Sequence, residues 1–192
     1  MKRPTLYGMA ACALMLAVVF PAAQSSAQDK SKRPSPPGTA TFTFADGKTI
    51  TINYSRPKIR DPQTGQPRKI YGGLVPYGEV WRAGANEATS FVTQSNLLVG
   101  GTSVPAGSYT LFILPQQSGP WKLIVSKKTG EWGIPYPGEQ NDFARINMKT
   151  ATTPAAVQDF TISFDKRGPN AGVMKFDWEN TSASVDFSEA SK

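Results

Sequence analysis

The feature that most restricts the fold of this chain is the alternation of apolar and polar side chains within short runs. In TITINY, the side chains of Ile50, Ile52 and Tyr54 share one face, because successive side chains of a strand point to opposite sides. The same spacing recurs in DFTISF (159–164) and VMKFDW (173–178). No segment shows the 3.6-residue spacing of an amphipathic helix, so the pattern predicts strands along the chain.

Runs of this kind follow one another at short intervals, with glycine, proline and asparagine between them. They occupy residues 39–44, 49–54, 89–94, 96–101, 109–114, 121–126, 143–148, 159–164, 173–178 and 182–187. Short strands joined by turn residues predict an all-β fold, a single antiparallel β-sandwich or partly open barrel of about nine or ten strands.

Two runs carry more specific expectations. Asp46-Gly47 lies between two alternating runs and predicts a tight hairpin. Residues 109–114 are apolar at nearly every position, which is typical of a central strand covered on both faces. We expect the following side chains to be buried in the core: Phe112, Ile113, Leu123, Ile162 and Phe176.

The N-terminus has the three-part layout of a secretory signal peptide. Lys2 and Arg3 supply a basic start, residues 9–20 form an apolar run, and Ser25 and Ala27 are small residues suited to cleavage. The apolar run falls short of the ~20 residues that a membrane-spanning helix needs. The pattern therefore predicts a cleaved signal rather than an anchor.

Cleavage after Ala27 would export the chain to the periplasm or the extracellular space, with no transmembrane segment left. A lipoprotein signal at Cys12 is the less favoured alternative, because the apolar run continues beyond this cysteine instead of ending at it. The polar, proline-rich residues 28–38 then predict a flexible linker, followed by the β-sandwich domain at 39–188 and a short tail at 189–192.

Composition excludes several kinds of chemistry. Cys12 is the only cysteine and the chain has no histidine, which removes Ser-His and Cys-His nucleophiles and histidine-ligated metal sites. No run resembles an oxygen-liganded calcium loop, so we expect no metal and no cofactor. Loss of Lys2 and Arg3 lowers the formal charge from +7 to +5. The remaining basic residues are scattered, which argues against nucleic-acid binding.

One turn-rich stretch, RKIYGGLVPYGEVWRAGANEATSF at residues 68–91, concentrates aromatic, basic and amide side chains. A second aromatic segment lies at residues 129–145, TGEWGIPYPGEQNDFAR, and includes Glu131 and Arg145. If both emerge from the same end of the sandwich, they form two walls of one cleft. Nine side chains make up the candidate ligand site: Arg56, Tyr71, Tyr77, Trp81, Arg82, Asn86, Glu87, Trp132 and Tyr136.

The residue types suggest roles. Tyrosine and tryptophan faces suit sugars and peptides, and guanidinium groups suit carboxylates or phosphates. We expect Arg82, Asn86 and Glu87 to form a polar network in which Arg82 keeps Glu87 ionised. These features favour a binding module for an envelope glycan, peptide or protein.

Two other functions compete with binding. The aromatic loop can be a packing element that only closes the fold of a structural or assembly protein. A carboxylate-based hydrolase would need a pair of carboxylates, which Glu87 could form with Glu79 or Glu131. We rank binding first, a structural role second and hydrolysis third.

Three motifs make the chain similar to a known family. They are YSRP at 54–57, RKIYGGLVPYGEVWRAGANEA at 68–88 and PAGSYTLFILP at 105–115. They resemble the patterns Y-S-R-P, R-x-I-[FY]-G-G-L-V-P-[YW]-G-x-x-W-R-x-G-A-N-E-A and P-A-G-x-Y-x-L-F-x-[IL]-P of exported bacterial proteins classed only as a domain of unknown function. The resemblance covers residues 39–187 and implies an all-β secreted domain. It implies no activity and no catalytic residue.

Overall fold

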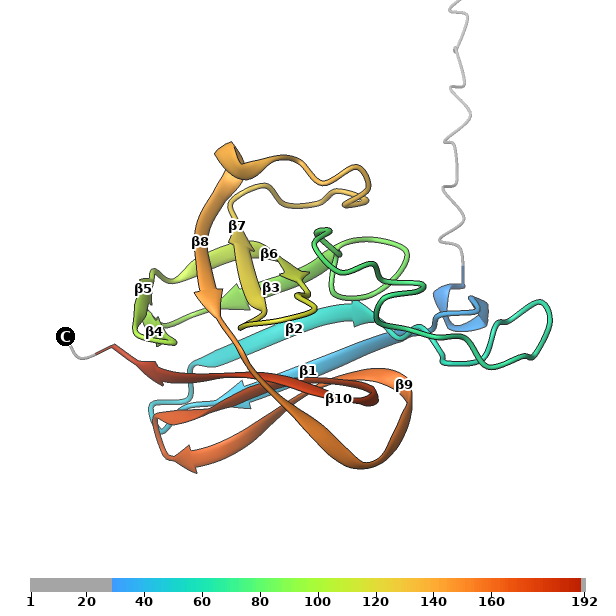
Figure 1. Cartoon of the computed structure of the whole chain (residues 1–192). Helices are drawn as coiled ribbons and strands as arrows, with labels where there is room; N and C mark the ends of the chain where they lie inside the picture. The colour runs from blue at the N-terminus through green and yellow to red at the C-terminus, as the bar shows by residue number, and fades with distance from the viewer. Residues whose placement is uncertain (1–28, 191–192) are drawn as a thin grey trace, which may run out of the picture.

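The computed structural model of the chain describes residues 29–190 (Figure 1). The predicted signal peptide at 1–27, including Cys12, lies outside the described residues, as do the last two residues of the predicted tail. Within the described part, the helical elements are two single turns of 3-10 helix, η1 (Lys30–Lys32) and η2 (Glu139–Asn141). None of its helices is long and apolar enough to cross a membrane.

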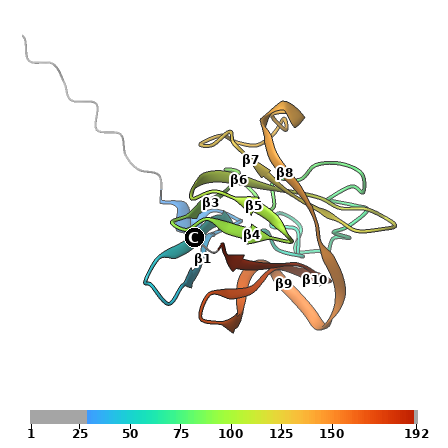
Figure 2. The same cartoon turned by 90° about the vertical axis from the view of Figure 1, so that its left-hand side faces the viewer.

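Two antiparallel sheets lie face to face and contain the ten strands of residues 29–190, which confirms the predicted β-sandwich (Figures 1 and 2). The larger sheet has the order β1 (Pro37–Thr43), β2 (Thr49–Ser55), β3 (Thr89–Thr93), β6 (Gly107–Leu114), β7 (Lys122–Ser126) and β8 (Asp142–Asn147). The smaller sheet has the order β5 (Thr102–Val104), β4 (Leu97–Val99), β10 (Ala171–Glu189) and β9 (Lys149–Gly168).

The predicted hairpin at Asp46-Gly47 joins β1 to β2. In this pair Phe42 lies opposite Ile50, and both side chains are buried. The Gly47 N–H donates to the Phe44 carbonyl at 3.1 Å, and Gly47 has a φ of 86°. A glycine is favoured there because a side chain disfavours positive φ.

The central position predicted for residues 109–114 is confirmed, since β6 lies between β3 and β7. Leu111 and Ile113 belong to the core between the sheets. Phe112 points to the opposite face and is also fully buried, with its ring 5.2 Å from that of Tyr136. The second cover is therefore a loop, residues 127–141 between β7 and β8, rather than another sheet.

The predicted strands at 173–178 and 182–187 are the two arms of a single element, β10. Glu179 has a φ of 54° at the bend, and the pairing register with β9 shifts on both sides of it. The Glu189 N–H donates to the Asn170 carbonyl at 2.8 Å, so the end of β10 returns beside its start.

Two elements of the smaller sheet go beyond the sequence prediction. β9 begins at Lys149, well before the predicted run at 159–164, because its polar first half pairs with β10. β5 contains no predicted run and pairs only with β4. The chain passes from β8 through Met148 directly into β9 and so connects the two sheets (Figure 1).

All five side chains predicted to be buried are at most 3% exposed. At the end of the sandwich near the aromatic-rich loop, the core consists largely of aromatic rings. The Trp81 and Trp178 rings stack at 5.7 Å, and the Tyr71 and Trp121 rings meet edge to face at 4.7 Å. These rings support the loop from beneath.

Part of the predicted linker at 28–38 belongs to the folded domain. β1 already begins at Pro37 and pairs with β2 over its whole length. Just before it, the Pro36 carbonyl accepts a hydrogen bond from the Arg56 N–H at 2.9 Å. A proline-rich composition gave no sign of these contacts, because they depend on a partner far along the chain.

Candidate functional site

The motif residues lie in a long irregular segment between β2 and β3, residues 56–88, which we call the signature loop. It occupies one end of the sandwich, on the right in Figure 1. Trp81 and Ile113 of β6 exchange two main-chain hydrogen bonds of 2.8 Å, which anchor the loop to the larger sheet. The buried Thr89 hydroxyl donates to the Ala83 carbonyl at 2.7 Å and closes the turn that follows.

Two of the predicted ligand-binding aromatics are mainly packing residues. Tyr71 is 5% exposed, and burial raises the pKa of its hydroxyl well above the usual range. Trp81 is partly buried against the core, and its indole N–H donates a 2.9 Å hydrogen bond to the Gly84 carbonyl. The prediction of exposed aromatic faces is therefore wrong for Tyr71, whereas Tyr77, 39% exposed, does present its ring.

The predicted ion pair between Arg82 and Glu87 is not formed. Arg82 Nη1 donates to the Trp132 carbonyl at 3.0 Å, and its guanidinium lies 5.2 Å from the centre of the Trp132 ring. Burial lowers the pKa of Arg82, and the more distant Glu87 charge only partly offsets this effect. Arg82 thus joins the signature loop to residues 127–141, as the two-wall hypothesis requires.

Glu87 is held by the N-terminal segment instead. Arg33 Nη1 donates to both of its carboxylate oxygens, at 2.8 and 3.0 Å, and Lys30 Nζ lies 3.1 Å away. The hydrogen bond from Arg33 is the main reason that the pKa of Glu87 falls to about 2. Glu87 therefore stays ionised as predicted, but Arg33 and Lys30 are responsible, which the sequence analysis missed because both lie in the predicted linker.

Two further predicted residues are engaged in holding the fold together. Asn86 Nδ2 donates to the Ser35 carbonyl at 3.0 Å and to Ser55 Oγ at 3.1 Å. Arg56 bonds to main-chain and side-chain oxygens of β9, which ties the signature loop to the smaller sheet. Neither side chain lines the cleft described below.

In the second loop, Tyr136 is also structural. Its hydroxyl donates to Asp142 and accepts a 3.2 Å hydrogen bond from Arg145 Nη2. Burial and the Asp142 carboxylate raise the pKa of Tyr136 to about 12. Trp132, by contrast, is 53% exposed. The Ala88 N–H donates to the Glu131 carbonyl at 3.1 Å, a second contact between the two loops.

A cleft of about 260 Å³ opens beside the signature loop. Trp81 and Trp178 belong to its lining, together with Val75 and Leu74. Four cationic side chains surround these apolar groups, and no acidic residue lines the cleft. We call it the basic cleft, and its cations are Lys58, Arg60, Arg68 and Arg82.

The cations of the basic cleft have few acidic partners. Within residues 29–190, the one salt bridge among them joins Arg68 Nη1 to Asp61 at 3.9 Å. Arg60 donates to the Gly65 carbonyl at 2.9 Å, and no hydrogen bond or salt bridge uses the Lys58 side chain. The site is therefore rich in positive charge that the described protein groups leave largely uncompensated.

Trp178 is also an unusual member of the lining. The side chain is fully buried, and its indole N–H has no acceptor among the described residues. A buried donor without an acceptor is costly, because its hydrogen bond with water is lost and not replaced.

Sequence analysis identified Trp81 and Arg82 of the basic cleft but missed its other cations and Trp178. Lys58 and Arg60 lie in a segment that looked like an ordinary polar connection, and Arg68 opens the stretch 68–91 but was not among the nine candidate side chains. Two cations between Pro57 and Pro67, with Arg68 directly after them, were the available signal. Trp178 gave none, because its place in an alternating run is equally typical of a core residue.

Of the two carboxylate pairs proposed for hydrolysis, the structure brings Glu87 together with Glu131 but not with Glu79. Glu79 is exposed on the signature loop and lines none of the hollows described here. Glu87 and Glu131 do line a common hollow of about 350 Å³ with Trp132. Because the pKa of Glu87 is about 2, this carboxyl carries no proton to donate near neutral pH.

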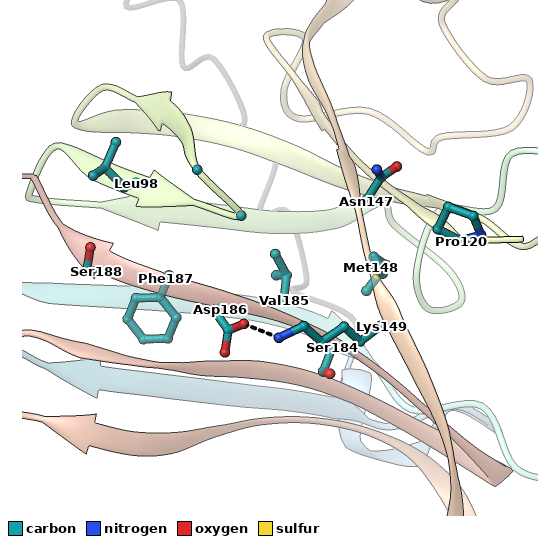
Figure 3. A pocket seen from close by; sticks show the side chains of 12 residues that line it. Leu98, Pro120, Asn147, Met148, Lys149, Ser184, Val185, Asp186, Phe187 and Ser188 are labelled. Atoms are coloured by element: carbon teal, nitrogen blue, oxygen red, sulfur yellow. Dashed lines mark hydrogen bonds and ion pairs between the residues drawn. The ribbon is translucent and has the colours of Figure 1, made fainter.

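A wider hollow is a groove of about 710 Å³ between β4, β10 and the β8–β9 junction (Figure 3). None of the predicted site residues lines it. Its charged side chains neutralise each other, since Lys149 Nζ lies 2.6 Å from Asp186 Oδ2. This groove therefore lacks free charged groups that would fix a ligand. No cluster of three or more potential metal ligands occurs within residues 29–190.

Fold and cleft together define a small antiparallel β-sandwich protein with a candidate ligand site at one end. The chain belongs to the family described as "Protein of unknown function (DUF2911)", which matches residues 35–187. The match begins just before β1 and ends within β10, so it spans both sheets. Comparison with curated proteins and with solved structures found no match.

Proposed function

We propose that the protein is a non-catalytic binding module that takes a carboxylate-bearing ligand in the basic cleft. The observation that carries this proposal is the set of four cations around an aromatic lining without an acidic residue. Guanidinium groups bind carboxylates through paired N–H donors, and aromatic faces bind the apolar part of the same ligand. Acidic peptides and acidic glycans both offer this combination.

Burial strengthens the case for an anion. Arg82 is partly withdrawn from water, and the hydrogen bond it makes is to a carbonyl rather than to a carboxylate. An incoming carboxylate would offset the desolvation of this guanidinium, and electrostatic attraction is stronger where water is partly excluded. A neutral ligand would leave the same charges uncompensated.

A purely structural role explains only part of the signature loop. Packing and internal hydrogen bonds account for Tyr71, Asn86 and Arg56. They do not account for the positive charges of Lys58 and Arg60, which are exposed beside the cleft. Arg60 donates to the Gly65 carbonyl, but neither side chain has an acidic partner among the described residues. Binding explains these two side chains, and a fold-closing role does not.

Export is part of the proposal. The N-terminal pattern of basic, apolar and small residues supports secretion through a signal peptide, and the ligand would then be met in the cell envelope or outside the cell. The glycans, peptides and proteins of that compartment include many that carry carboxylates.

Titration calorimetry with two carboxylate probes, a hexaglutamate peptide and a galacturonic acid hexamer, tests the binding function. We expect at least one probe to bind, with an affinity that falls as salt rises. The double variant Lys58→Gln/Arg60→Gln should weaken binding about tenfold, since each lost charge contact contributes roughly 0.5–1 kcal/mol.

The matched control is Lys127→Gln/Arg167→Gln, which removes two positive charges from exposed side chains outside the cleft. It should bind like the unmodified protein. If neither probe binds, or if the control loses as much affinity as the cleft variant, the proposed function is wrong. Equal melting temperatures of the two double variants would show that loss of fold is not responsible.

A further inference from the structure

A second hollow, of about 380 Å³, lies between the signature loop, the β6–β7 connection and the β9–β10 pair. We call it the neutral groove, because every side chain of its lining is uncharged although the chain has 35 charged residues, 21 basic and 14 acidic. The lining includes Tyr77, Trp121, Gln117, Thr150, Thr152 and Thr181.

One wall of the neutral groove continues the face of a buried residue outward into solvent. Met148 is buried, and the exposed Thr150 and Thr152 follow it at two-residue steps on the same face of the strand. Their partners on β10 are the fully buried Ala183 and the half-buried Thr181. The face that carries core side chains elsewhere therefore presents hydroxyl groups to solvent here.

The hydroxyls and amides of this wall are available to a ligand. Among residues 29–190, no hydrogen bond uses the side-chain oxygens of Thr150, Thr152 or Thr181, or the amide of Gln117. Polar groups placed together on a concave surface and left without protein partners are suited to hydrogen-bonding a polar molecule.

The opposite wall supplies an aromatic surface held in a fixed position. Tyr77 lies against Gly72, where a Cβ atom would meet one edge of the Tyr77 ring at 2.8 Å, so the absence of a side chain at Gly72 leaves room for the ring. The Tyr77 hydroxyl makes no hydrogen bond to any described residue. Trp121 is fixed by a 2.9 Å hydrogen bond from its indole N–H to the Gln116 carbonyl.

These features select a class of ligand. A charged molecule would find no opposite charge in the groove, and an apolar one would leave the amides and hydroxyls without partners. A sugar ring has an apolar C–H face for an aromatic ring and hydroxyls that both donate to and accept from amides and threonines. We propose that the neutral groove binds a neutral oligosaccharide.

This inference does not depend on the proposed carboxylate-binding function. The neutral groove and the basic cleft share no lining residue. Saccharide binding should be insensitive to salt, whereas carboxylate binding should weaken as salt rises. Lys58→Gln/Arg60→Gln should weaken only the binding of carboxylates, so either proposal can fail without the other.

The test is calorimetry and saturation-transfer NMR with tetramers of β-1,4-linked glucose, β-1,4-linked N-acetylglucosamine and α-1,4-linked glucose. At least one should bind to the protein. Tyr77→Ala should weaken that binding roughly five- to tenfold, the loss expected for one aromatic stacking contact. Thr152→Val, which keeps the shape of the side chain but removes its hydroxyl, should also weaken it.

Two controls separate a lost contact from a lost fold. Thr41→Val makes the same chemical change at an exposed position of β1, and Phe143→Ala removes an exposed ring from β8. Neither residue lines the neutral groove. Both should bind the saccharide normally. The proposal is overturned if none of the three tetramers binds, or if Tyr77→Ala and Thr152→Val bind as well as these controls. Binding of a neutral alanine hexapeptide in place of the saccharides would also overturn it.

Discussion

Replacement of Glu87 by Gln measures how firmly the N-terminal segment is fastened to the signature loop. The carboxylate accepts hydrogen bonds of 2.8 and 3.0 Å from Arg33 and lies 3.1 Å from Lys30. If Glu87 had instead paired with a buried Arg82, as expected from the sequence, its replacement would have left that charge uncompensated and lowered the free energy of unfolding by about 3–5 kcal/mol. The Glu87 side chain is 42% exposed, however, and that of Arg33 is 19% exposed. Water screens this pair, so we expect a loss of about 1 kcal/mol.

For a domain of this size, 1 kcal/mol corresponds to a fall of roughly 2–4 °C in melting temperature. Thermal unfolding followed by circular dichroism near pH 7 measures it, with Glu79→Gln as the control, because Glu79 is exposed and forms no salt bridge within residues 29–190. In a double-mutant cycle with Arg33→Gln, the two losses should add incompletely, since both changes remove the Arg33–Glu87 contact while Glu87→Gln also removes that of Lys30.

The pH dependence of the loss has a defined direction. The folded-state pKa of Glu87, about 2, lies below its ordinary value of 4.5. Its contribution to stability is therefore fully present above pH ~4.5 and is lost as the pH falls through the folded-state value. The difference in stability between unmodified protein and Glu87→Gln should shrink from pH 7 to pH 3. A difference that stays constant over this range, or one no larger than that of Glu79→Gln, would refute the reasoning.

Two further predictions concern the β7–β8 loop and the N-terminus. Gly133→Ala should cost about 1–3 kcal/mol in urea unfolding, because Gly133 has a φ of 80° and a new Cβ would lie 2.8 Å from the Cβ of Ala88. Gly130→Ala, also at positive φ but in open space, should cost less, and equal costs would contradict a packing effect. N-terminal sequencing of exported protein should begin at Gln28, and an intact Met1 would show that no signal is cleaved.

The alternation of side chains was sufficient to predict an antiparallel sandwich or partly open barrel, and the structure is the sandwich. Ile50 and Ile52 can be buried together only if the chain is extended and one face meets a second layer. The unbroken apolar run of β6 likewise required cover on both faces. These conclusions are local, because the period of a strand is a property of neighbouring residues.

The division of the signature loop into packing and binding residues was not readable in the same way. Tyr71 and Tyr77 have the same side chain and lie close in sequence, yet one is buried and the other exposed. Arg82 and Glu87 are close in sequence and opposite in charge, so the sequence predicted an ion pair between them. In the structure Arg82 donates to the Trp132 carbonyl, and Glu87 pairs with Arg33. Charge and aromaticity indicate what a side chain can do, without indicating which group it meets.

The tertiary structure decided the candidate sites, because each is assembled from segments that are distant along the chain. Trp81 meets Trp178 across the two sheets, and the carboxylate of Glu87 meets Arg33 from the N-terminal segment. The threonines of β9 become the wall of a groove only because β10 bends at Glu179 and brings Thr181 opposite them. Sequence by itself determined where most strands lie and which residues are rich in chemistry, but not β5 or the first half of β9. Long-range packing alone determined which of those residues share a cavity, since that depends on the register and bending of elements that no local pattern records.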